Sequence, residues 1–575
     1  MDFRYVLNKL RNLGELVVIT DELSPEYEIP LIISKLEKKY GLLFENISNY
    51  KGWRIASGIY TSEQRLAKIL EISLNEFRRR YSQALKKSGE TIEVSKSPAY
   101  EIIWDRNIDL SKIPIPIFYE KTPKYLTASI IVAHDPETGV RNLSYHRMTP
   151  IDKNKFAVRV VERDLWTYMM KAKAQGKKYL EAVVIIGVDP ATALAASTSV
   201  PIDVDELAVA AAILQKPIEE IKARTVNVYI PANTEIVMEG AFLLDVHVDE
   251  GPFVDITKTY DKVRKQPVFE VKLIAMRKNP ILHIILPAGY EHMFLMGYPA
   301  ETMIREHVSR VTRLHDVHLS YAGCCWLEAI ISIEKRHPDE PINAGLAAFS
   351  AHPSLKKVII VDPDIDIRNP KDVEWAVITR AHPVKDMIVI PRAKGSSLDK
   401  SGEPRAKIII DATMKGDKHS FMKAKIPMTP RVLKIMRKLK EGNFYIKNSN
   451  AIPLISPTEH KEIKGKVLKM EKLSFLGEVD EHGKLPNGET LHNAILCLKS
   501  GKGSTVGALV LYKVARTGKG PKAILVVEED PVLISGAALA DIPVLKITPK
   551  LYEKLKKNDL IQIKFDENSV KIIYE

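Results

Sequence analysis

The sequence predicts a multidomain protein that combines α/β and α+β architecture. At roughly 100–200 residues per domain, a chain of 575 residues corresponds to about three to five domains. Helix and strand patterns alternate at the N-terminus and again over residues 301–413, whereas residues 113–287 consist mainly of short β-rich runs separated by turn residues. A hydrophobic fraction of 45% and a charged fraction of 27% are ordinary for globular proteins and exclude disordered and collagen-like classes.

The N-terminal elements follow from caps and apolar periodicity. The candidate N-cap Asp2 and the apolar stripe after it predict a helix that stops at Gly14. Predicted strands over residues 15–20 and 42–47 flank a second helix, which is expected to end at Gly41.

The later elements are predicted from the same signals. Strands are expected over residues 128–133, 181–187, 225–230, 269–274, 282–286, 358–361 and 387–390, and in a hairpin of residues 560–565 and 571–574. Helices are expected over residues 165–174, 205–214 and 551–557, and from Pro430 to Gly442.

These patterns divide the chain into five parts. They are an N-terminal α/β domain, a β-rich domain, a second α/β domain, a basic helical linker and a C-terminal β/α domain, over residues 1–110, 111–300, 301–415, 416–450 and 451–575 respectively. The net charge is +13, and residues 411–450 alone hold ten basic and three acidic residues. We interpret this segment as a solvated linker; steering of anionic substrates and nucleic-acid binding are the alternatives, and only three aromatic residues are available there for stacking on bases.

The composition also predicts where the protein works. The N-terminus carries charges throughout, unlike a signal peptide, and no uncharged apolar stretch reaches the roughly 18–20 residues that span a bilayer. The three cysteines, Cys324, Cys325 and Cys497, suit a reducing cytosol and lack metal-ligand spacing. We therefore expect a cytoplasmic protein without membrane contact.

A pair of carboxylates is the first candidate for chemistry. Glu250 and Asp255 flank a Gly-Pro turn that can bring both into one pocket, where different surroundings split their pKa values and leave one able to act as an acid. An ordinary turn is the simpler interpretation of this loop taken alone.

The segment from Asn142 to Arg147 is the second candidate. In an extended backbone Asn142, Ser144 and His146 share one face, and Tyr145 and Arg147 share the other. The guanidinium of Arg147 is the stronger anion-binding candidate, although a half-buried strand explains the pattern more simply.

Two further features could contact phosphate. Ser197, Thr198 and Ser199 form a hydroxyl-rich loop before Asp205 and Glu206, which suits either phosphate binding at exposed backbone N–H groups or helix capping. Lys407 lies beside a short apolar run, and a solvated surface charge is the simpler interpretation of a lone lysine.

Taken in order, these clusters resemble the UbiD-like decarboxylases, which use prenylated FMN. The resemblance covers about residues 1–420 and implies a UbiD-like fold whose β-rich domain is a flavin-binding split β-barrel. Beyond the clusters above, it is carried by Asp2-Phe3-Arg4, Leu43-Phe44-Glu45-Asn46, Asp189-Pro190-Ala191, Pro231-Ala232-Asn233-Thr234-Glu235, Trp375-Ala376-Val377 and Asp411-Ala412-Thr413. The segments Ala288-Gly289-Tyr290-Glu291-His292 and Gly323-Cys324-Cys325-Trp326 resemble archaeal members.

The resemblance implies a catalytic triad of Arg147, Glu250 and Asp255. Asp255 would donate the proton that replaces CO2, and Glu250 would hold Arg147 in place. Loss of CO2 from an α,β-unsaturated acid needs an electron sink that no side chain supplies, so the chemistry requires a cofactor.

The resemblance also implies a cofactor site with a divalent ion. Asn142 and Glu206 match two metal ligands, and Asp164 occupies the position where the family usually has histidine; oxygen ligands suit Mg²⁺ or Mn²⁺. A potassium ion is a further expected cofactor. The residues expected to contact prenylated FMN are Asn142, Ser144, Tyr145, His146, Arg147, Ser197, Thr198, Ser199, Glu206 and Lys407.

Residues 451–575 are similar to the swivelling small subunit of aconitase X-type dehydratases. The similarity is carried by the order of a Gly-rich turn at residues 498–507, the segment at 521–525 and the stretch at 531–540. Ser504 falls where that family has a functional serine near the substrate, and the iron–sulfur cluster belongs to a separate large subunit. The turn lacks Walker A spacing, and a plain structural turn is the alternative.

Together the two resemblances predict decarboxylation of trans-anhydromevalonate 5-phosphate to isopentenyl phosphate and CO2, in a chain joined to a dehydratase small subunit. The expected partners are the phosphorylated acid, a flavin prenyltransferase, an iron–sulfur large subunit and further copies of the chain. The alternatives are decarboxylation of an aromatic acid in quinone synthesis and, from another class, a basic nucleic-acid-binding or scaffold protein.

Overall fold

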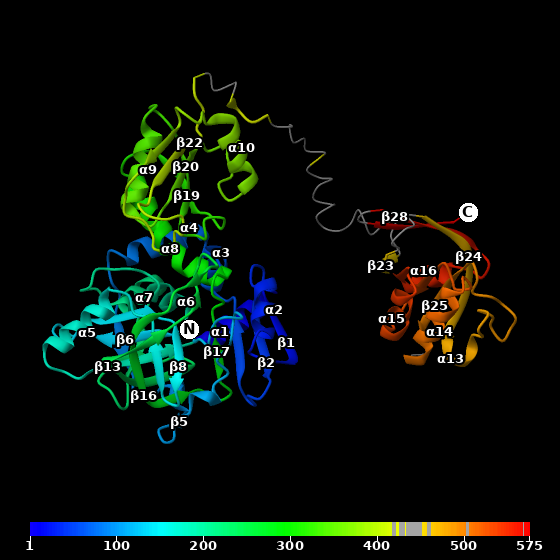
Figure 1. Ribbon diagram of the computed structural model, residues 1–575, viewed down its shortest axis with the longest axis horizontal. Helices are drawn as coiled ribbons and strands as arrows, with labels where there is room; N and C mark the ends of the chain where they lie inside the picture. Colours follow the sequence, from blue (N-terminus) through cyan, green and yellow to red (C-terminus); the bar gives the residue numbers. More distant parts are fainter. Residues whose placement is uncertain are drawn as a thin grey trace. The chain divides into compact units, whose positions relative to one another are not determined.

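The computed structural model describes residues 1–416, 421–424, 432, 451–456, 462–501, 505–566 and 569–574. The chain forms two compact units, Met1–Lys423 and Ala424–Glu575, which are described separately below (Figure 1). Within these residues, no helix combines the length and the apolar character that crossing a bilayer would need. The linker predicted over residues 416–450, and its predicted helix, fall almost entirely outside the described residues.

The first unit begins with a small α/β layer. Helix α1 (Phe3–Asn12) starts at the predicted cap, because the Asp2 carboxylate accepts a hydrogen bond from Tyr5 N at 2.7 Å, and the chain turns at Gly14 with a φ of 69°. Helix α2 (Glu28–Leu36) ends earlier than predicted. The four-stranded sheet has the order β1 (Leu16–Leu23), β2 (Gly41–Ile47), β3 (Arg54–Ser57), β17 (Ile281–His283).

The centre of this unit is an eight-stranded sheet with the order β7-β6-β10-β13-β16-β9-β8, and β5 (Ile102–Trp104) pairs with β16. The strands are β6 (Ile130–His134), β7 (Arg141–Tyr145), β8 (Met148–Asp152), β9 (Lys155–Val158), β10 (Tyr179–Ile186), β13 (Ile236–Glu250) and β16 (Arg264–Met276). Strands β7 and β8 lie at opposite ends of this order, yet only His146 and Arg147 separate them in the chain. The sheet therefore curls until its two edges meet at these residues, which makes a barrel that is open along one seam.

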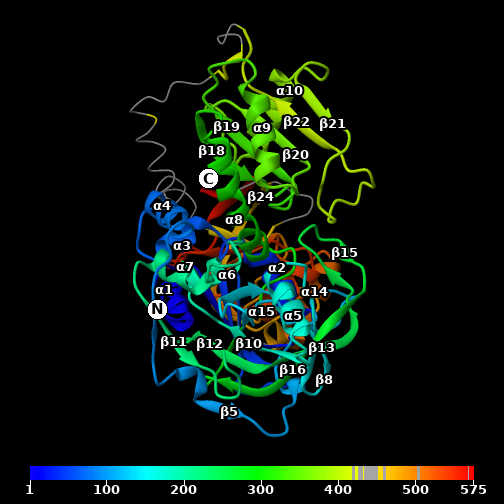
Figure 2. The ribbon, with the colours of Figure 1, turned by 90° about the vertical axis from the view of Figure 1, so that its left-hand side faces the viewer.

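Three helices surround the open seam. They are α5 (Asp164–Ala174), α6 (Pro190–Ala196) and α7 (Glu206–Leu214) (Figure 2). Almost all residues of α6 and α7 are buried. Helices α5 and α7 agree with the helices predicted over residues 165–174 and 205–214. Helix α6 was not predicted.

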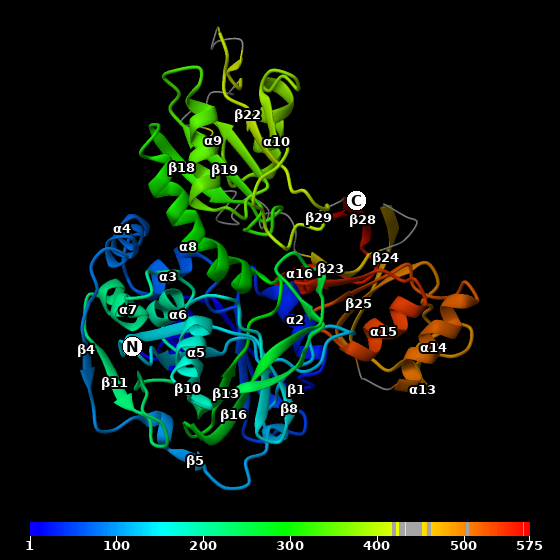
Figure 3. The ribbon, with the colours of Figure 1, turned by 60° about the vertical axis from the view of Figure 1, so that its left-hand side comes forward.

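Helix α8 (Tyr290–Val308) leads from the barrel to a second α/β layer in the same unit (Figure 3). Its sheet has the order β18 (Leu314–Leu319), β19 (Glu328–Ile333), β20 (Lys357–Val361), β22 (Lys407–Asp411), β21 (Met387–Ile390). Successive residues of the central strands alternate between two cores: Ile331 packs with helix α9 (Glu340–Ala351), and Ile330 packs with helix α10 (Pro370–Arg380).

The second unit is a seven-stranded mixed sheet with the order β23-β27-β26-β25-β24-β28-β29. The strands are β23 (Ala451–Ile455), β24 (Glu462–Leu473), β25 (Ala494–Gly501), β26 (Ala523–Val526), β27 (Val544–Ile547), β28 (Leu560–Asp566) and β29 (Ser569–Tyr574). Helices α14 (Thr505–Arg516) and α15 (Pro531–Leu539) cover one face, and α16 (Pro549–Lys554) covers the other. The C-terminal helix and hairpin lie where they were predicted.

Besides α2, the strand predicted over residues 282–286 ends early, since β17 stops at His283, and two further predictions differ from the structure. The strand predicted over residues 225–230 is absent up to Val228, because Arg224 N and Thr225 N donate to the buried Glu239 carboxylate, and a short strand β12 (Tyr229–Pro231) follows. The loop of Ser197, Thr198 and Ser199 follows the end of α6; it does not open a helix, since α7 has its own N-cap at Asp205. The boundaries predicted inside the first unit stay predictions.

Candidate active site

A cavity of about 330 Å³ lies at the open seam of the barrel. Strand β7, the ends of α6 and α8 and the segment 159–165 contribute to its wall. Of the residues predicted to act, the cavity wall includes Asn142, Ser144, Tyr145, His146, Arg147, Asp164, Ser197, Thr198, Ser199, Glu206 and Asp255. Residues that are far apart in the sequence are thus brought to one site.

Arg147 and Glu250 form a bidentate ion pair at one end of the cavity. Arg147 Nε donates to Glu250 Oε1 at 2.8 Å and Nη2 donates to Oε2 at 3.1 Å, while Tyr125 Oη donates to Oε1 at 2.7 Å. Glu250 is fully buried, and the Phe253 ring lies 4.2 Å from the guanidinium carbon. Burial opposes the charge on Arg147, but the hydrogen bonds and the charge of Glu250 outweigh it and raise the arginine pKa.

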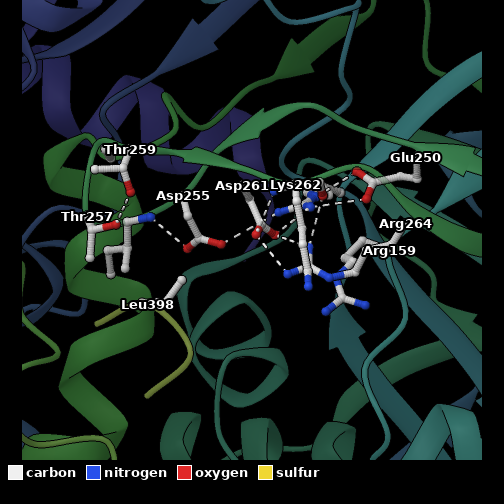
Figure 4. A network of polar contacts seen from close by, with 12 residues as sticks. Arg159, Glu250, Asp255, Thr257, Thr259, Asp261, Lys262, Arg264 and Leu398 are labelled. Carbon is white, nitrogen blue, oxygen red and sulfur yellow. Dashed lines mark hydrogen bonds and ion pairs between the residues drawn. The ribbon is translucent and has the colours of Figure 1, made fainter. Parts of the chain in front are cut away.

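Two aspartates approach the same guanidinium from a short hairpin of β14 (Phe253–Val254) and β15 (Tyr260–Asp261). Asp255 Oδ2 lies 3.7 Å from Arg147 Nη1, and Figure 4 shows Asp255 and Glu250 on opposite sides of the cluster. Asp261 Oδ2 lies 3.4 Å from Arg147 Nη2, and Asp261 is also paired with Arg264. Burial raises the Asp261 pKa, but the bonds and charges of the two arginines lower it to about 2.

The other end of the cavity holds oxygen donors. Glu206 opens α7, and its carboxylate accepts hydrogen bonds from Asn142 Nδ2 and Leu143 N, both at 2.9 Å. Burial raises its pKa to about 8, and burial also raises the pKa of Asp164, which opens α5. A divalent cation would compensate both carboxylates, and the donor set of two carboxylates and one amide oxygen is chemically suited to Mg²⁺ or Mn²⁺.

The predicted metal ligands are two carboxylates and one amide, so they differ from a cluster made only of acidic and histidine side chains. Among the residues that the structure describes, no three His, Cys, Asp or Glu side chains are grouped closely enough to hold a metal. The predicted ligand set therefore depends on the Asn142 amide, whose Oδ1 accepts a hydrogen bond from Ser144 Oγ at 2.9 Å.

Several other side chains that were predicted to contact the cofactor form hydrogen bonds within the protein. Ser197 Oγ and Thr198 Oγ1 each donate to Leu194 O at 2.7 Å, so both hydroxyls close the end of α6. His146 bonds Ser144 Oγ at 2.8 Å and Arg159 O at 2.9 Å, and burial lowers its pKa to about 4, which keeps the imidazole neutral.

Lys407 does not line the cavity, in contrast to the sequence-based expectation. It begins β22 in the second α/β layer, where its ammonium donates to Pro353 O at 2.7 Å and Leu355 O at 2.5 Å and lies 4.7 Å from the centre of the Phe349 ring. Burial lowers its pKa to about 8. A buried lysine can satisfy its donors on backbone carbonyls, which sequence spacing does not reveal. Ser504 lies outside the described residues.

Four residues of the site were not predicted from the sequence: Asp261, Arg159, Arg163 and His292. Asp261 was hidden because it reaches Arg147 only through the hairpin that pairs it with Phe253. The two arginines carried a weak signal, because Arg159, Val161 and Arg163 occupy every second position and all line the cavity, although the chain turns at residues 162–163. His292 also lines it, and burial lowers its pKa.

Fold and site together define a class of protein: an enzyme whose split barrel holds an arginine–carboxylate pair and a second acid beside a cavity that suits a phosphorylated cofactor. The family models match along nearly the whole chain. They are the 3-octaprenyl-4-hydroxybenzoate carboxy-lyase N-terminal domain over residues 7–85, its Rift-related domain over 91–290, its C-terminal domain over 293–412, and the aconitase X swivel domain over 456–572.

Similar curated proteins are anhydromevalonate phosphate decarboxylases. The protein from Methanothermobacter thermautotrophicus is 38% identical over 412 residues, which cover 71% of this chain and 96% of that protein. The protein from Methanosarcina mazei is 39% identical over 433 residues, which cover 74% of this chain and 100% of that protein.

Similar solved structures are UbiD-class enzymes. HmfF from Pelotomaculum thermopropionicum in complex with FMN is 34% identical with a TM-score of 0.72, covering 74% of this chain and 98% of that one. An evolved dimeric form of the same enzyme in complex with prFMN is 33% identical with a TM-score of 0.69. The match covers 74% of this chain and 97% of that chain. The chain belongs to the UbiD family of carboxy-lyases, which are decarboxylases, and carries an aconitase X swivel domain at its C-terminal end. The predicted fold class is confirmed.

Proposed function

We propose that this decarboxylase converts trans-anhydromevalonate 5-phosphate to isopentenyl phosphate and CO2. The relatives named for this substrate support the proposal, since they match the first unit over 96–100% of their own length. The single observation that carries the chemistry is the Arg147–Glu250 pair with Asp255 at one end of the cavity. An anion-binding guanidinium and an acid lie there together, as removal of CO2 and reprotonation of carbon require.

Each side chain of this cluster has a distinct proposed role. Arg147 orients the substrate carboxylate, and the buried Glu250 fixes the guanidinium through two hydrogen bonds. Asp255 delivers a proton to the carbon that has lost CO2. Phe253, Leu295 and Met296 line the cavity and exclude water from the reacting carbon. Bound prenylated FMN would supply the electron sink that the protein lacks.

The cofactor would be held at the opposite end of the cavity. Asn142, Asp164 and Glu206 would bind Mn²⁺ or Mg²⁺, which would supply positive charge for an anionic cofactor group, and a potassium ion is part of the same proposal. Ser199 and Arg163 line the cavity beside these ligands and would contact that phosphate. A flavin prenyltransferase would supply the cofactor.

The second unit would act as the small subunit of a phosphomevalonate dehydratase. Its match to the aconitase X swivel domain supports this role, and it would require a separate iron–sulfur large subunit. The dehydration would then yield the acid that the first unit decarboxylates. We also propose that the chain assembles with further copies of itself.

The test is one experiment on full-length protein co-produced with a flavin prenyltransferase. Trans-anhydromevalonate 5-phosphate is supplied, isopentenyl phosphate is sought by mass spectrometry, and the mass of the bound flavin is read in the same run. Product together with a prenylated flavin is the expected result. A prenylated flavin without product would refute the substrate, and protein without any flavin would refute the cofactor.

A further inference from the structure

Two arginines of the cavity have no acidic partner among the residues that the structure describes. Arg159 Nη1 donates to Val160 O at 3.2 Å, and Arg163 Nη1 donates to Ser199 Oγ at 3.2 Å. Neither guanidinium forms an ion pair with any carboxylate in the part of the chain that the structure describes, whereas Arg147 has three within 4 Å. Cationic side chains that line a cavity without a protein counter-charge indicate a site for bound anions.

The two arginines lie at different ends of the cavity. Arg159 is held beside the catalytic cluster, because its backbone N donates to Arg147 O at 3.1 Å and its carbonyl accepts from His146 Nδ1. Arg163 contacts Ser199 and precedes Asp164, at the end with the oxygen donors. The backbone turns between the two positions, because Arg163 N donates to Val161 O at 2.8 Å, and only Arg159 is bonded to the backbone of the catalytic cluster.

No carboxylate in the part of the chain that the structure describes pairs directly with the Arg159 guanidinium. Its side chain is half-buried, and burial together with the positive charges of Arg264 and Arg147 lowers its pKa, against smaller opposing effects of Glu250 and Asp261 (Figure 4). Those two carboxylates are already bonded to Arg147 and Arg264. Among the described residues, Arg159 therefore has no carboxylate bonded directly to it, and a bound anion that lies against its guanidinium would compensate this charge.

We propose that Arg159 binds the phosphate group of the substrate and so selects phosphorylated over unphosphorylated acids. This inference rests on the proposed function, which requires a ligand with a carboxylate and a phosphate at its two ends. Arg147 takes the carboxylate, and Arg159, anchored to the Arg147 backbone, takes the phosphate. Arg163 serves the cofactor phosphate at the other end, so the two arginines divide two phosphates between them.

The test compares Arg159→Gln with Arg163→Gln as the matched control, in full-length protein co-produced with a flavin prenyltransferase. The kcat/KM is measured for trans-anhydromevalonate 5-phosphate and for the unphosphorylated acid, and bound flavin is quantified from its absorbance. For Arg159→Gln we expect kcat/KM to fall at least about tenfold with the phosphorylated acid, mainly through KM, because a hydrogen bond between charged groups is lost. The unphosphorylated acid should change by less than about threefold, and bound flavin should not change. Arg163→Gln should instead lower bound flavin.

A second variant and a binding measurement keep the test decisive. Arg159→Lys retains the charge and should recover part of the preference for the phosphorylated acid. Calorimetric binding of isopentenyl phosphate should weaken at least about tenfold in Arg159→Gln relative to the natural protein. Equal loss with both acids, or loss of flavin, would overturn the inference. If the natural protein makes no isopentenyl phosphate, the proposed function fails, and the calorimetry alone then decides whether Arg159 holds a phosphate.

Discussion

Two aspartates of one hairpin show how environment assigns different roles to the same side chain. Asp261 is paired with Arg264 and touches Arg147, and its pKa of about 2 means that it has no proton to give near neutral pH. Asp255 is 3.7 Å from Arg147, accepts a hydrogen bond from Ile256 N and lines the cavity. Asp255 is therefore the better candidate for the acid, and Asp261 is a fixed negative charge that positions Arg147.

The first prediction concerns this division of roles. Asp255→Asn should lower turnover at least about 100-fold, because the amide has no acidic proton to transfer. Glu250→Gln should have a similar effect, because it replaces the buried carboxylate that holds the Arg147 guanidinium through two hydrogen bonds. Both variants should keep the flavin, which is checked by absorbance beside product analysis.

Asp255→Glu is the matched control, since it restores a carboxylic acid at the same position and should recover measurable turnover. Near-normal turnover of Asp255→Asn would show that another group delivers the proton. His292 would then be examined first, because it also lines the cavity.

The sequence predicted those residues of the site that lie in recognisable segments, and it did not predict contacts that depend on the fold. The roles of Arg147, Glu250, Asp164 and Glu206 were expected from the family resemblance. The structure places all but Glu250 on the cavity wall, and Glu250 bonds to Arg147 from behind it. Arg159 has no motif, and its alternation with Val161 and Arg163 is a signal that many half-buried strands share. Lys407 satisfies its ammonium on carbonyls from a distant loop, a contact that spacing cannot encode.

At the scale of elements, helix caps connect local sequence to the site. The Asp189 carboxylate accepts hydrogen bonds from Ala191 N at 2.9 Å and Thr192 N at 3.1 Å, which starts the buried helix α6. That helix ends in the loop whose Ser197, Thr198 and Ser199 line the cavity. The cap therefore helps to hold one wall of the proposed cofactor site.

The second prediction follows from this cap. Asp189→Ala should destabilise the first unit by about 1 kcal/mol and lower the amount of flavin retained after purification. Asp530→Ala is the matched control: Asp530 caps α15 in the second unit, where its carboxylate accepts from Val532 N at 2.9 Å. It should cost a similar amount of local stability and leave flavin content unchanged. Thermal unfolding and flavin absorbance check both, and equal flavin loss in the two variants would contradict the argument.

A buried glutamate connects the end of α2 to the start of α8. Glu37 follows α2 and is 1% exposed; its Oε1 accepts from Tyr290 N at 2.9 Å, and its Oε2 has no hydrogen-bond partner. Burial raises its pKa to about 8, and the nearby Glu291 adds to the shift. The folded protein therefore keeps a proton that the unfolded chain releases above a pH of about 4.5.

The third prediction is a pH dependence with a definite sign. Because the folded-state pKa of Glu37 is raised, its effect on stability is absent below about pH 4.5, and stability is lost as the pH rises toward 8. Glu37→Gln has no proton to release, so its free energy of unfolding should fall less than that of the natural protein between pH 5 and pH 8. The difference should be on the order of a few kcal/mol at most. Denaturant unfolding at several pH values checks this, and parallel curves for the two proteins would contradict it.

At the scale of the whole molecule, the curl of the central sheet was the least predictable feature. Strands β6, β10 and β16 were expected from apolar runs, but β13 was not, because its 15 residues change from buried to exposed along their length. Barrel formation depends on pairing between strands far apart in the chain, such as β13 with β16 and β6 with β10. The apolar periodicity of a strand does not indicate which strand it pairs with. The barrel, in which β7 and β8 meet at Arg147, could therefore be predicted only from the family resemblance.

The last prediction concerns the independence of the two units. The Methanosarcina mazei relative is matched over 100% of its length by 74% of this chain, so that relative has the decarboxylase part and no counterpart of the swivel domain. The first unit, Met1–Lys423, has its own cores, and its cavity is lined entirely by its own residues. A chain of residues 1–423 should therefore bind flavin and retain kcat/KM for trans-anhydromevalonate 5-phosphate to within about threefold, because units that pack around separate cores contribute additively. Asp255→Asn in the shortened chain is the control for background product. A shortened chain that binds flavin normally yet loses turnover would show that the second unit contributes directly to decarboxylation, and the division of labour proposed for the two units would then be wrong.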